Sequence, residues 1–148
     1  ITVVYGGGKV GMMGKISASV INSGGKVIGI IPKFLVNKEL MDSNITKTII
    51  VDSMGERKKL LYENGDAFLI LPGGSGTIEE ATEIISWSIL SIHKKPIIIF
   101  NYEKYWDSMI EMYDNAKKYK FGDKNLQSLC KTVETFEEFT NLIKKNKN

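Results

Sequence analysis

The sequence predicts an α/β fold in which helices flank a parallel β-sheet. Short apolar runs alternate with segments of helical period along the whole chain, which is typical of βαβ units. Glycine-rich turns stand where two of the predicted strands lead into helices, at the edge where open parallel sheets bind ligands. The 148 residues contain no repeat, low-complexity tract or linker, so we expect one domain over residues 1–148.

Six strands and five helices are expected in alternation. The strands span Thr2–Tyr5, Lys26–Ile31, Thr48–Asp52, Ala67–Leu71, Pro96–Phe100 and Leu129–Val133. The helices span Gly11–Asn22, Met54–Glu63, Thr77–Ser91, Trp106–Tyr119 and Phe136–Lys144. Ser53 with Glu56, and Thr135 with Glu138, have the spacing of capping boxes and mark two helix starts. Gly24-Gly25 marks the end of the first helix.

The composition argues against several classes of function. No apolar run approaches the roughly 20 residues that a membrane span needs, so no membrane partner is expected. The net charge is only mildly positive, since the chain has 20 Lys+Arg and 17 Asp+Glu residues. The basic clusters also lack an aromatic-basic motif, so the composition argues against a nucleic-acid partner. The single cysteine, Cys130, is expected to be buried and fits a reducing, cytoplasmic compartment. One cysteine and one histidine cannot furnish a zinc site, so no metal is expected.

The most informative segment is Leu71–Glu80, a glycine-rich turn between a predicted strand and a predicted helix. Backbone N–H groups point outward at such a helix N-terminus, and the helix dipole favours an anion there. The glycines let a ligand approach the backbone closely. Glu79 and Glu80 follow this cradle, where their charge opposes a phosphate. A substrate with a phosphate at one end and developing positive charge at the other would use both features.

Two interpretations of Glu80 stand at this point. Thr77 and Glu80 have the T-x-x-E spacing of a capping box, so Glu80 could serve only to cap the helix. Alternatively, its carboxylate stabilises an oxocarbenium-like transition state while a glycosidic C–N bond is cleaved. The second interpretation explains why a carboxylate stands beside an anion site.

A second glycine-rich turn, Gly6–Gly11, matches the G-x-G-x-x-G pattern of dinucleotide sites. Such sites carry an acidic residue near the end of the next strand, where this chain has Ile31-Pro32. The sequence therefore argues against NAD. We expect the turn to line the same crevice as Leu71–Glu80, with Gly7 and Gly8 among the binding residues. The alternative is that its glycines serve turn geometry alone.

Basic residues follow the third predicted strand. Arg57 and Lys58 fall in the first turns of a helix, where cations oppose the helix dipole. They are either solvated surface residues or, at the carboxyl edge of the sheet, a guanidinium and an ammonium that recognise phosphate or carboxylate. The long loop over residues 32–47 also follows a strand, where the ligand-contacting loops of such sheets lie.

Together these segments resemble the Lonely Guy family of cytokinin riboside 5′-monophosphate phosphoribohydrolases, which are often labelled lysine decarboxylases. Pro72–Glu80 matches the family's P-G-G-x-G-T-x-x-E motif, and Met54 with Arg57-Lys58 matches its M-x-x-R-K motif. The resemblance implies a Rossmann-like, three-layer α/β/α fold, a homodimer, and no metal or organic cofactor. Lysine decarboxylation has no support, because no lysine stands in a recognisable pyridoxal-binding frame.

By resemblance, the protein hydrolyses the N-glycosidic bond of a purine riboside 5′-monophosphate, cytokinin-type or AMP-like, to the free base and ribose 5-phosphate. Arg57 and Glu80 match the catalytic positions. The substrate- and phosphate-binding positions are Gly7, Gly8, Glu39, Met54, Lys58, Gly73, Gly74, Ser75, Gly76 and Thr77.

The main rival function is a nucleotide-binding or molybdenum-cofactor carrier protein of similar fold, without turnover. A carrier has no need of Arg57 and Glu80, so this pair favours the enzyme. The chain departs from the family at its start, because relatives have a preceding strand and helix. Ile1 opens directly into an apolar run with neither a methionine nor a polar lead-in, so we expect residues to precede it.

Overall fold

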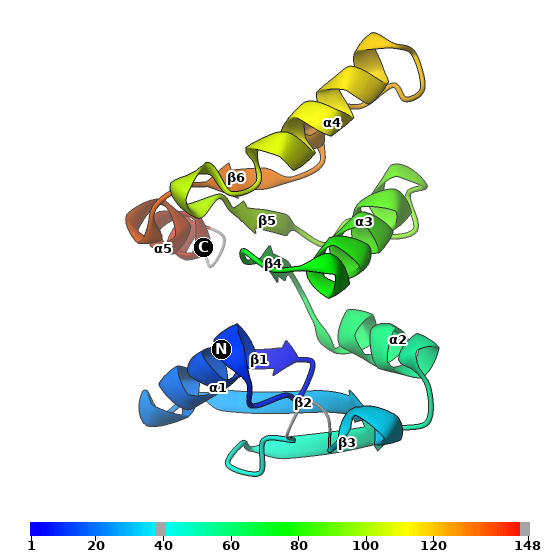
Figure 1. The fold of residues 1–148 in the computed structure, drawn as a ribbon. Coiled ribbons are helices and arrows are strands. Elements are labelled where there is room, and N and C mark those ends of the chain that lie inside the picture. The colour runs from blue at the N-terminus through cyan, green and yellow to red at the C-terminus, as the bar shows by residue number, and fades with distance from the viewer. Residues whose placement is uncertain (38–40, 146–148) are drawn as a thin grey trace. The chain divides into compact units, whose positions relative to one another are not determined.

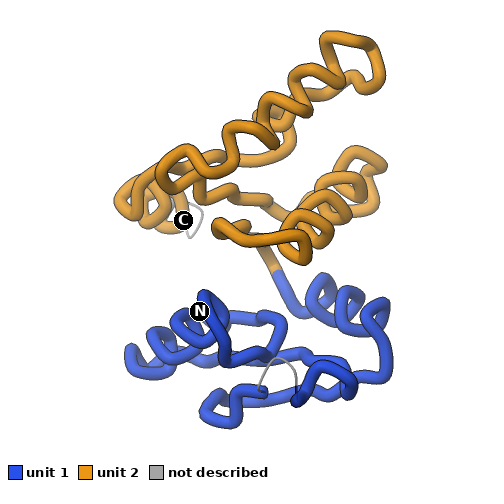
Figure 2. Tube along the Cα trace, viewed as in Figure 1, with its two compact units in different colours: residues 1–65 blue, residues 66–148 orange. Residues whose placement is uncertain are grey.

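A computed structural model describes residues 1–37 and 41–145, and the chain divides into two compact units. Unit 1 spans residues 1–65 and unit 2 spans residues 66–148 (Figure 2). Strands and helices alternate in each unit, and among the described residues the named strands pair in parallel within their own unit, so the predicted α/β fold class is confirmed. The six strands form two three-stranded sheets, one in each unit. The single domain stays a prediction.

Unit 1 is built on a sheet whose strands follow in the order β1-β2-β3 (Figure 1). Its elements are β1 (Thr2–Tyr5), α1 (Gly11–Asn22), β2 (Lys26–Pro32), the 3₁₀ turn η1 (Lys33–Leu35), β3 (Lys47–Val51) and α2 (Met54–Asn64). The central strand β2 contributes the fully buried Val27, Ile30 and Ile31. Both α1 and α2 pack on β2, which explains why this strand is a nearly continuous apolar run.

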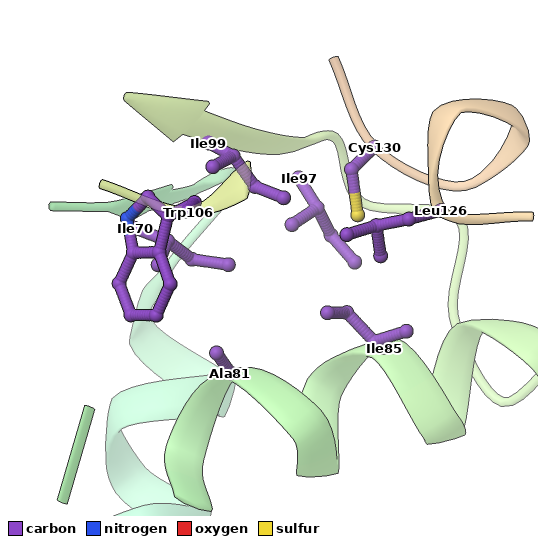
Figure 3. Packing of buried hydrophobic residues seen from close by; sticks show 8 residues of the cluster. All are labelled: Ile70, Ala81, Ile85, Ile97, Ile99, Trp106, Leu126 and Cys130. Carbon is purple, nitrogen blue, oxygen red and sulfur yellow. The ribbon is translucent and has the colours of Figure 1, made fainter. Parts of the chain in front are cut away.

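Unit 2 repeats this plan with the strand order β4-β5-β6 (Figure 1). Its elements are β4 (Phe68–Ile70), α3 (Ser75–Ile89), β5 (Ile97–Phe100), η2 (Tyr102–Lys104), α4 (Asp107–Lys118), η3 (Leu126–Ser128), β6 (Lys131–Val133) and α5 (Phe136–Lys145). On β5, Ile97 and Ile99 point toward Ile85 of α3 in the core of this unit (Figure 3). The opposite face of β5 is also buried at Ile98, as expected of a central parallel strand.

The observed ends of the elements lie within two residues of the predicted ones, and the starts of α3 and β6 show why they differ. The structure begins α3 at Ser75 rather than Thr77, because Gly74 is the N-cap. The predicted last strand loses Leu129 and Cys130, whose amides both donate to the Leu126 carbonyl: the Leu129 bond closes a 3₁₀ turn, and the Cys130 bond spans one residue more. Local hydrogen bonding therefore takes precedence over apolar pattern at that point.

Both predicted capping boxes are confirmed. Ser53 Oγ accepts the Glu56 amide at 3.1 Å, and Thr135 Oγ1 accepts the Glu138 amide at 3.2 Å. In both boxes the glutamate returns to the amide one residue before the capping side chain, Asp52 in one case and Glu134 in the other. Across the described ranges, no helix combines the length and the apolar character that crossing a membrane requires.

Candidate functional site

In unit 1, Arg57 lies at the carboxyl edge of the parallel sheet. The capping box at Ser53 starts α2 directly after β3 and places Arg57 on the first turn of the helix. The side chain is only 6% exposed, so the interpretation as a solvated surface residue is wrong. Its guanidinium packs against Gly6, where a Cβ would stand 3.1 Å from the Arg57 Cζ. A strand-to-helix turn and a buried cation thus meet at one edge of unit 1.

The first turns of α2 also carry the predicted Met54 and Lys58. Met54 Sδ lies 3.9 Å from Nη1 of Arg57, a weak contact that helps to hold the guanidinium plane. Met54 is itself about one third exposed, and Lys58 is half-buried. Arg57 and Met54 are therefore brought together by one helical turn, as their spacing in the sequence indicates.

The glycine turn after β1 packs closely on β2. Gly7 has a φ of +78°, and a Cβ there would stand 3.1 Å from the Ile31 Cβ and 3.3 Å from the Ile30 amide. Both Gly7 and Gly8 are buried. Gly7 accepts the Asp42 amide at 3.0 Å, and Gly8 forms an isolated bridge with Met41. The role of these two glycines in binding substrate stays a prediction, whereas the role of Gly7 in close packing is evident.

The described part of the long loop returns to this turn through Asp42, a residue that the sequence analysis missed. Asp42 is 7% exposed, and its carboxylate accepts hydrogen bonds from Ser17 Oγ at 2.6 Å and the Asn44 amide at 3.0 Å. Tyr5 OH lies 3.5 Å away. Burial alone would raise the pKa of the Asp42 carboxyl, but these hydrogen bonds and the Lys9 charge hold its pKa below the ordinary value. The predicted Glu39, in the same loop, lies outside the described residues.

In unit 2, the Pro72–Gly74 turn leads from β4 into the N-terminus of α3. Gly73 packs against Thr77, whose Cβ would lie 2.8 Å from a Cβ at position 73. Gly74 is the N-cap and has no side chain to accept the first amides of the helix. A Cβ at Gly74 or Gly76 would meet no described atom within 4 Å, so both glycines border open space. With Ser75 exposed between them, these N–H groups and the helix dipole can receive an anion.

The interpretation that Glu80 forms a capping box with Thr77 as the N-cap is wrong. Gly74 holds that position, and Thr77 lies inside the helix. Glu80 is therefore one turn further along α3, half-buried and three residues after Thr77, so the two side chains share a helix face. Glu79, the other carboxylate of the motif, is exposed. The two glutamates thus differ in exposure, and the half-buried one is Glu80.

Tyr105 is a second residue that the sequence analysis missed. Its hydroxyl donates to the Gly73 carbonyl at 2.8 Å, across 32 residues of chain. Tyr105 follows β5, whose carboxyl end lies at the same sheet edge as that of its neighbour β4. That shared edge was the available signal, because loops after adjacent parallel strands lie next to one another.

A chemical inventory of the described residues narrows what these two units can do. Among them, no group of three or more histidine, cysteine, aspartate or glutamate side chains is placed to hold a metal ion. His93 is buried, and its ring nitrogens contact the Ile84 carbonyl at 2.9 Å and the Lys95 amide at 3.1 Å. Among the described residues, the features that could carry chemistry are the start of α3 with its carboxylate in unit 2 and, separately, the buried guanidinium in unit 1.

The chain is similar to known proteins over most of its length. A family model described as possible lysine decarboxylase matches residues 13–143. Cytokinin riboside 5′-monophosphate phosphoribohydrolase LOG2 of Arabidopsis thaliana is 46% identical over 116 residues, which are 78% of this chain and 54% of that protein. LOG4 of the same plant, with the same enzyme name, is 39% identical over 145 residues, which are 98% of this chain and 66% of that protein. The chain thus spans between half and two thirds of these relatives.

Proposed function

This chain belongs to the family described as possible lysine decarboxylase, as a member of its Lonely Guy group, and on that premise we propose that it is a nucleoside 5′-monophosphate phosphoribohydrolase. The proposed reaction hydrolyses the N-glycosidic bond of a purine riboside 5′-monophosphate and releases the free base and ribose 5-phosphate. The observation that carries the proposal is the start of α3, where an uncapped helix N-terminus precedes Glu80 by one turn.

The substrate phosphate is assigned to the N-terminus of α3. Gly74 and Gly76 border open space there, so a phosphate oxygen can approach the backbone amides without meeting a Cβ. No acidic residue stands in the first turn of α3 to oppose it. Thr77 Oγ1, which packs against Gly73, adds a hydroxyl to the same turn.

Glu80 is assigned to the ribose. As the bond between C1′ and the base nitrogen breaks, its electron pair leaves with the base, which takes up a proton, and positive charge develops on the sugar. A carboxylate beside C1′ stabilises that charge, and water then adds its oxygen to C1′ and releases a proton. One electrostatic group of this kind typically contributes about 2.7–4 kcal/mol, or roughly 10²–10³ in rate.

Arg57 is assigned to positioning the ribose and phosphate or assisting the departing base. Its guanidinium is held by Gly6 and Met54, so little side-chain freedom is lost when it binds an anion. A non-catalytic nucleotide carrier would need neither a buried guanidinium nor a carboxylate behind its phosphate turn.

The decisive test is incubation of the full-length protein with AMP and with N6-isopentenyl-AMP, followed by chromatography of the products. We expect free base and ribose 5-phosphate in equal amounts from at least one substrate, and release of base about 10²–10³ times slower from Glu80→Gln. Tight nucleotide binding with no base from either substrate would favour the carrier instead. The comparison of the two substrates also decides which base is preferred.

We also propose that the protein is a homodimer, as the family resemblance implies. On α3 and at its C-cap, the apolar Ile78, Ile89 and Leu90 are 44%, 36% and 69% exposed, which suits a helix that packs against a second copy. Light scattering after size-exclusion chromatography measures the mass directly, and a monomer at micromolar concentration would contradict the proposal. The cytoplasmic location stays a prediction.

A further inference from the structure

We propose that Tyr105 is a positioning residue for the phosphate-binding turn, because its hydroxyl selects the orientation of the peptide between Gly73 and Gly74. This inference rests on the proposed function, which assigns the phosphate to that turn. The direct observation is the 2.8 Å hydrogen bond from Tyr105 OH to the Gly73 carbonyl.

A peptide plane fixes the direction of one group from that of the other. The carbonyl of Gly73 and the N–H of Gly74 belong to the same plane, and the described chain contains no cis peptide bond. In a trans peptide these two groups point in opposite directions. When Tyr105 holds the Gly73 carbonyl on one side, the Gly74 N–H is therefore turned to the other.

Glycines make this orientation easy to lose. Neither Gly73 nor Gly74 has a Cβ to restrict rotation of the peptide between them, so the alternative orientation is accessible to the backbone. A rotated peptide would turn the Gly73 carbonyl toward the anion and would repel it. One hydrogen bond from outside the turn is enough to favour the binding orientation, and the structure places Tyr105 there.

The segment that carries Tyr105 is itself held in an uncommon conformation. Glu103 and Lys104 have φ values of 49° and 61°, a region that non-glycine residues rarely adopt. Two consecutive residues of this kind persist only where the surroundings impose them. Asn101, 2% exposed, supplies that constraint: its Oδ1 accepts the Trp106 amide at 2.7 Å, and its Nδ2 donates to Asp107 Oδ1 at 2.8 Å.

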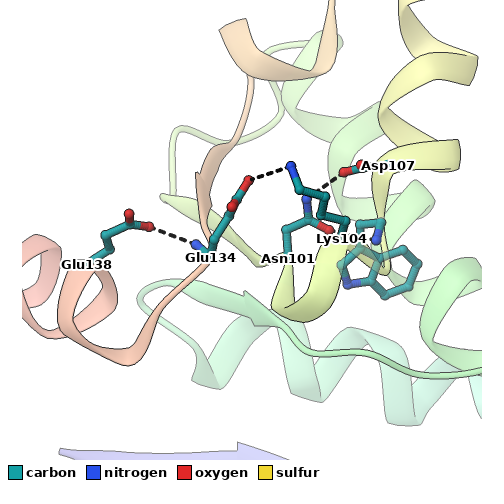
Figure 4. Close-up of polar contacts among 6 residues, drawn as sticks. Asn101, Lys104, Asp107, Glu134 and Glu138 are labelled. Atoms are coloured by element: carbon teal, nitrogen blue, oxygen red, sulfur yellow. Dashed lines mark hydrogen bonds and ion pairs between the residues drawn. The ribbon is translucent and has the colours of Figure 1, made fainter.

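Figure 4 shows these contacts, with Asn101 turned toward Asp107 and Lys104 reaching Glu134. The Lys104–Glu134 ion pair is 3.9 Å long and exposed, so it contributes little. The Asn101 hydrogen bonds are shorter and involve a buried side chain, and they bend the chain so that Tyr105 comes back toward β4. Glu103, Lys104 and Tyr105 all lie within the segment that the Asn101 hydrogen bonds close.

The chain offers a matched control for the hydroxyl. Tyr102 lies three residues earlier in the same segment and is 54% exposed, close to the 52% of Tyr105. Its ring stacks on Phe100 with centroids 6.3 Å apart, and its hydroxyl has no hydrogen bond within the described part of the chain. Tyr105→Phe and Tyr102→Phe therefore remove the same atom from similar surroundings, and only the first removes a contact with the turn.

The experiment compares these two variants in the full-length protein. Binding of ribose 5-phosphate is measured by calorimetry, KM and kcat are measured with AMP, and Tm is measured by thermal unfolding. We expect Tyr105→Phe to weaken ribose 5-phosphate and raise KM by about tenfold, the effect of one neutral hydrogen bond, with kcat and Tm near wild type. Tyr102→Phe should match wild type in every measurement.

The outcomes separate this inference from the proposed function. If the wild type binds ribose 5-phosphate but hydrolyses no nucleotide, the proposed function fails, and weaker binding by Tyr105→Phe still supports the positioning role. If hydrolysis is observed and Tyr105→Phe binds and reacts like wild type, the positioning role fails alone. Three other results would overturn the positioning role of Tyr105. They are a drop in Tm large enough to explain the weaker binding by Tyr105→Phe, equally weak binding by Tyr102→Phe, and a wild type that does not bind ribose 5-phosphate.

Discussion

The guanidinium of Arg57 rests on the backbone of Gly6, so that the cation of α2 and the glycine turn after β1 form one packed unit. A Cβ on Gly6 would stand 3.1 Å from the Arg57 Cζ and closer still to Nη2, and 3.4 Å from Met13 Sδ. Gly6 is therefore required by a close approach of its neighbour, whereas Gly7 is required by its positive φ. This contact leads to the first prediction.

Gly6→Ala should displace the Arg57 guanidinium while leaving the fold in place. Overpacking of this kind costs about 1–3 kcal/mol of stability. Misplacing a positioning group by about 1 Å can cost roughly 10²-fold in rate, so we expect a loss of that order in kcat/KM with AMP. The control is Gly55→Ala, also in unit 1, where a Cβ would meet only Ser53 Oγ at 3.9 Å. Wild-type kcat/KM in Gly6→Ala would contradict the role of Arg57.

Glu80→Gln should lower kcat by about 10²–10³, because it removes the charge that stabilises the ribosyl cation. Ribose 5-phosphate should still bind, since the N-terminus of α3 is unchanged. Glu79→Gln is the matched control: the neighbouring glutamate is exposed, and its variant should turn over like wild type. Near-full turnover by Glu80→Gln, in single-turnover kinetics with AMP, would exclude the catalytic assignment.

Asp42→Asn should destabilise unit 1 in a pH-dependent way. At pH 7 we expect a loss of about 1.5–3 kcal/mol, the range for hydrogen bonds to a charged group. The pKa of Asp42 is lowered in the folded protein, so its contribution is present above the unfolded pKa, near 4, and is lost as the pH falls through the folded value. The stability gap between wild type and variant should therefore narrow below about pH 4.

Urea unfolding followed by circular dichroism from pH 7 to pH 3 measures this gap. Asp114→Asn on the exposed face of α4 is the control, because the same change there removes no buried hydrogen bond. A gap of constant size across the range would show that Asp42 contributes through its shape and not through its charge.

Cys130 should resist alkylation in the native protein. The thiol is 4% exposed, and burial raises its pKa to about 12. At pH 8 only about one thiol in 10⁴ is then ionised, against about a quarter for an ordinary cysteine. Iodoacetamide at pH 8, with peptide mass spectrometry of the Cys130 site, should find almost no modification before urea is added and complete modification after. Rapid labelling without urea would show that this part of unit 2 opens readily.

Local sequence was enough to predict the order and type of the α-helices and strands in the described residues, though not the three 3₁₀ helices, because periodicity, glycine turns and capping boxes act within a few residues. The start of α2 illustrates this: Ser53 and Glu56 cap the helix as their spacing indicates, and Arg57 follows from that start. The glycine turn before α3 was predicted on the same basis. Thr77 shows the limit of local sequence as a guide: it has the spacing of a capping residue with Glu80, yet it lies inside the helix.

Contacts between distant segments had no local signature, and the tertiary structure alone supplies them. Pairing of Ser17 with Asp42, and of Tyr105 with Gly73, joins residues 25 and 32 positions apart whose spacing follows no helical or strand period. The burial of Arg57 is of the same kind, because its guanidinium packs on Gly6, which follows β1 and is distant in the sequence. Backbone hydrogen bonding sets local form, whereas the packing of sheet edges determines which side chains meet.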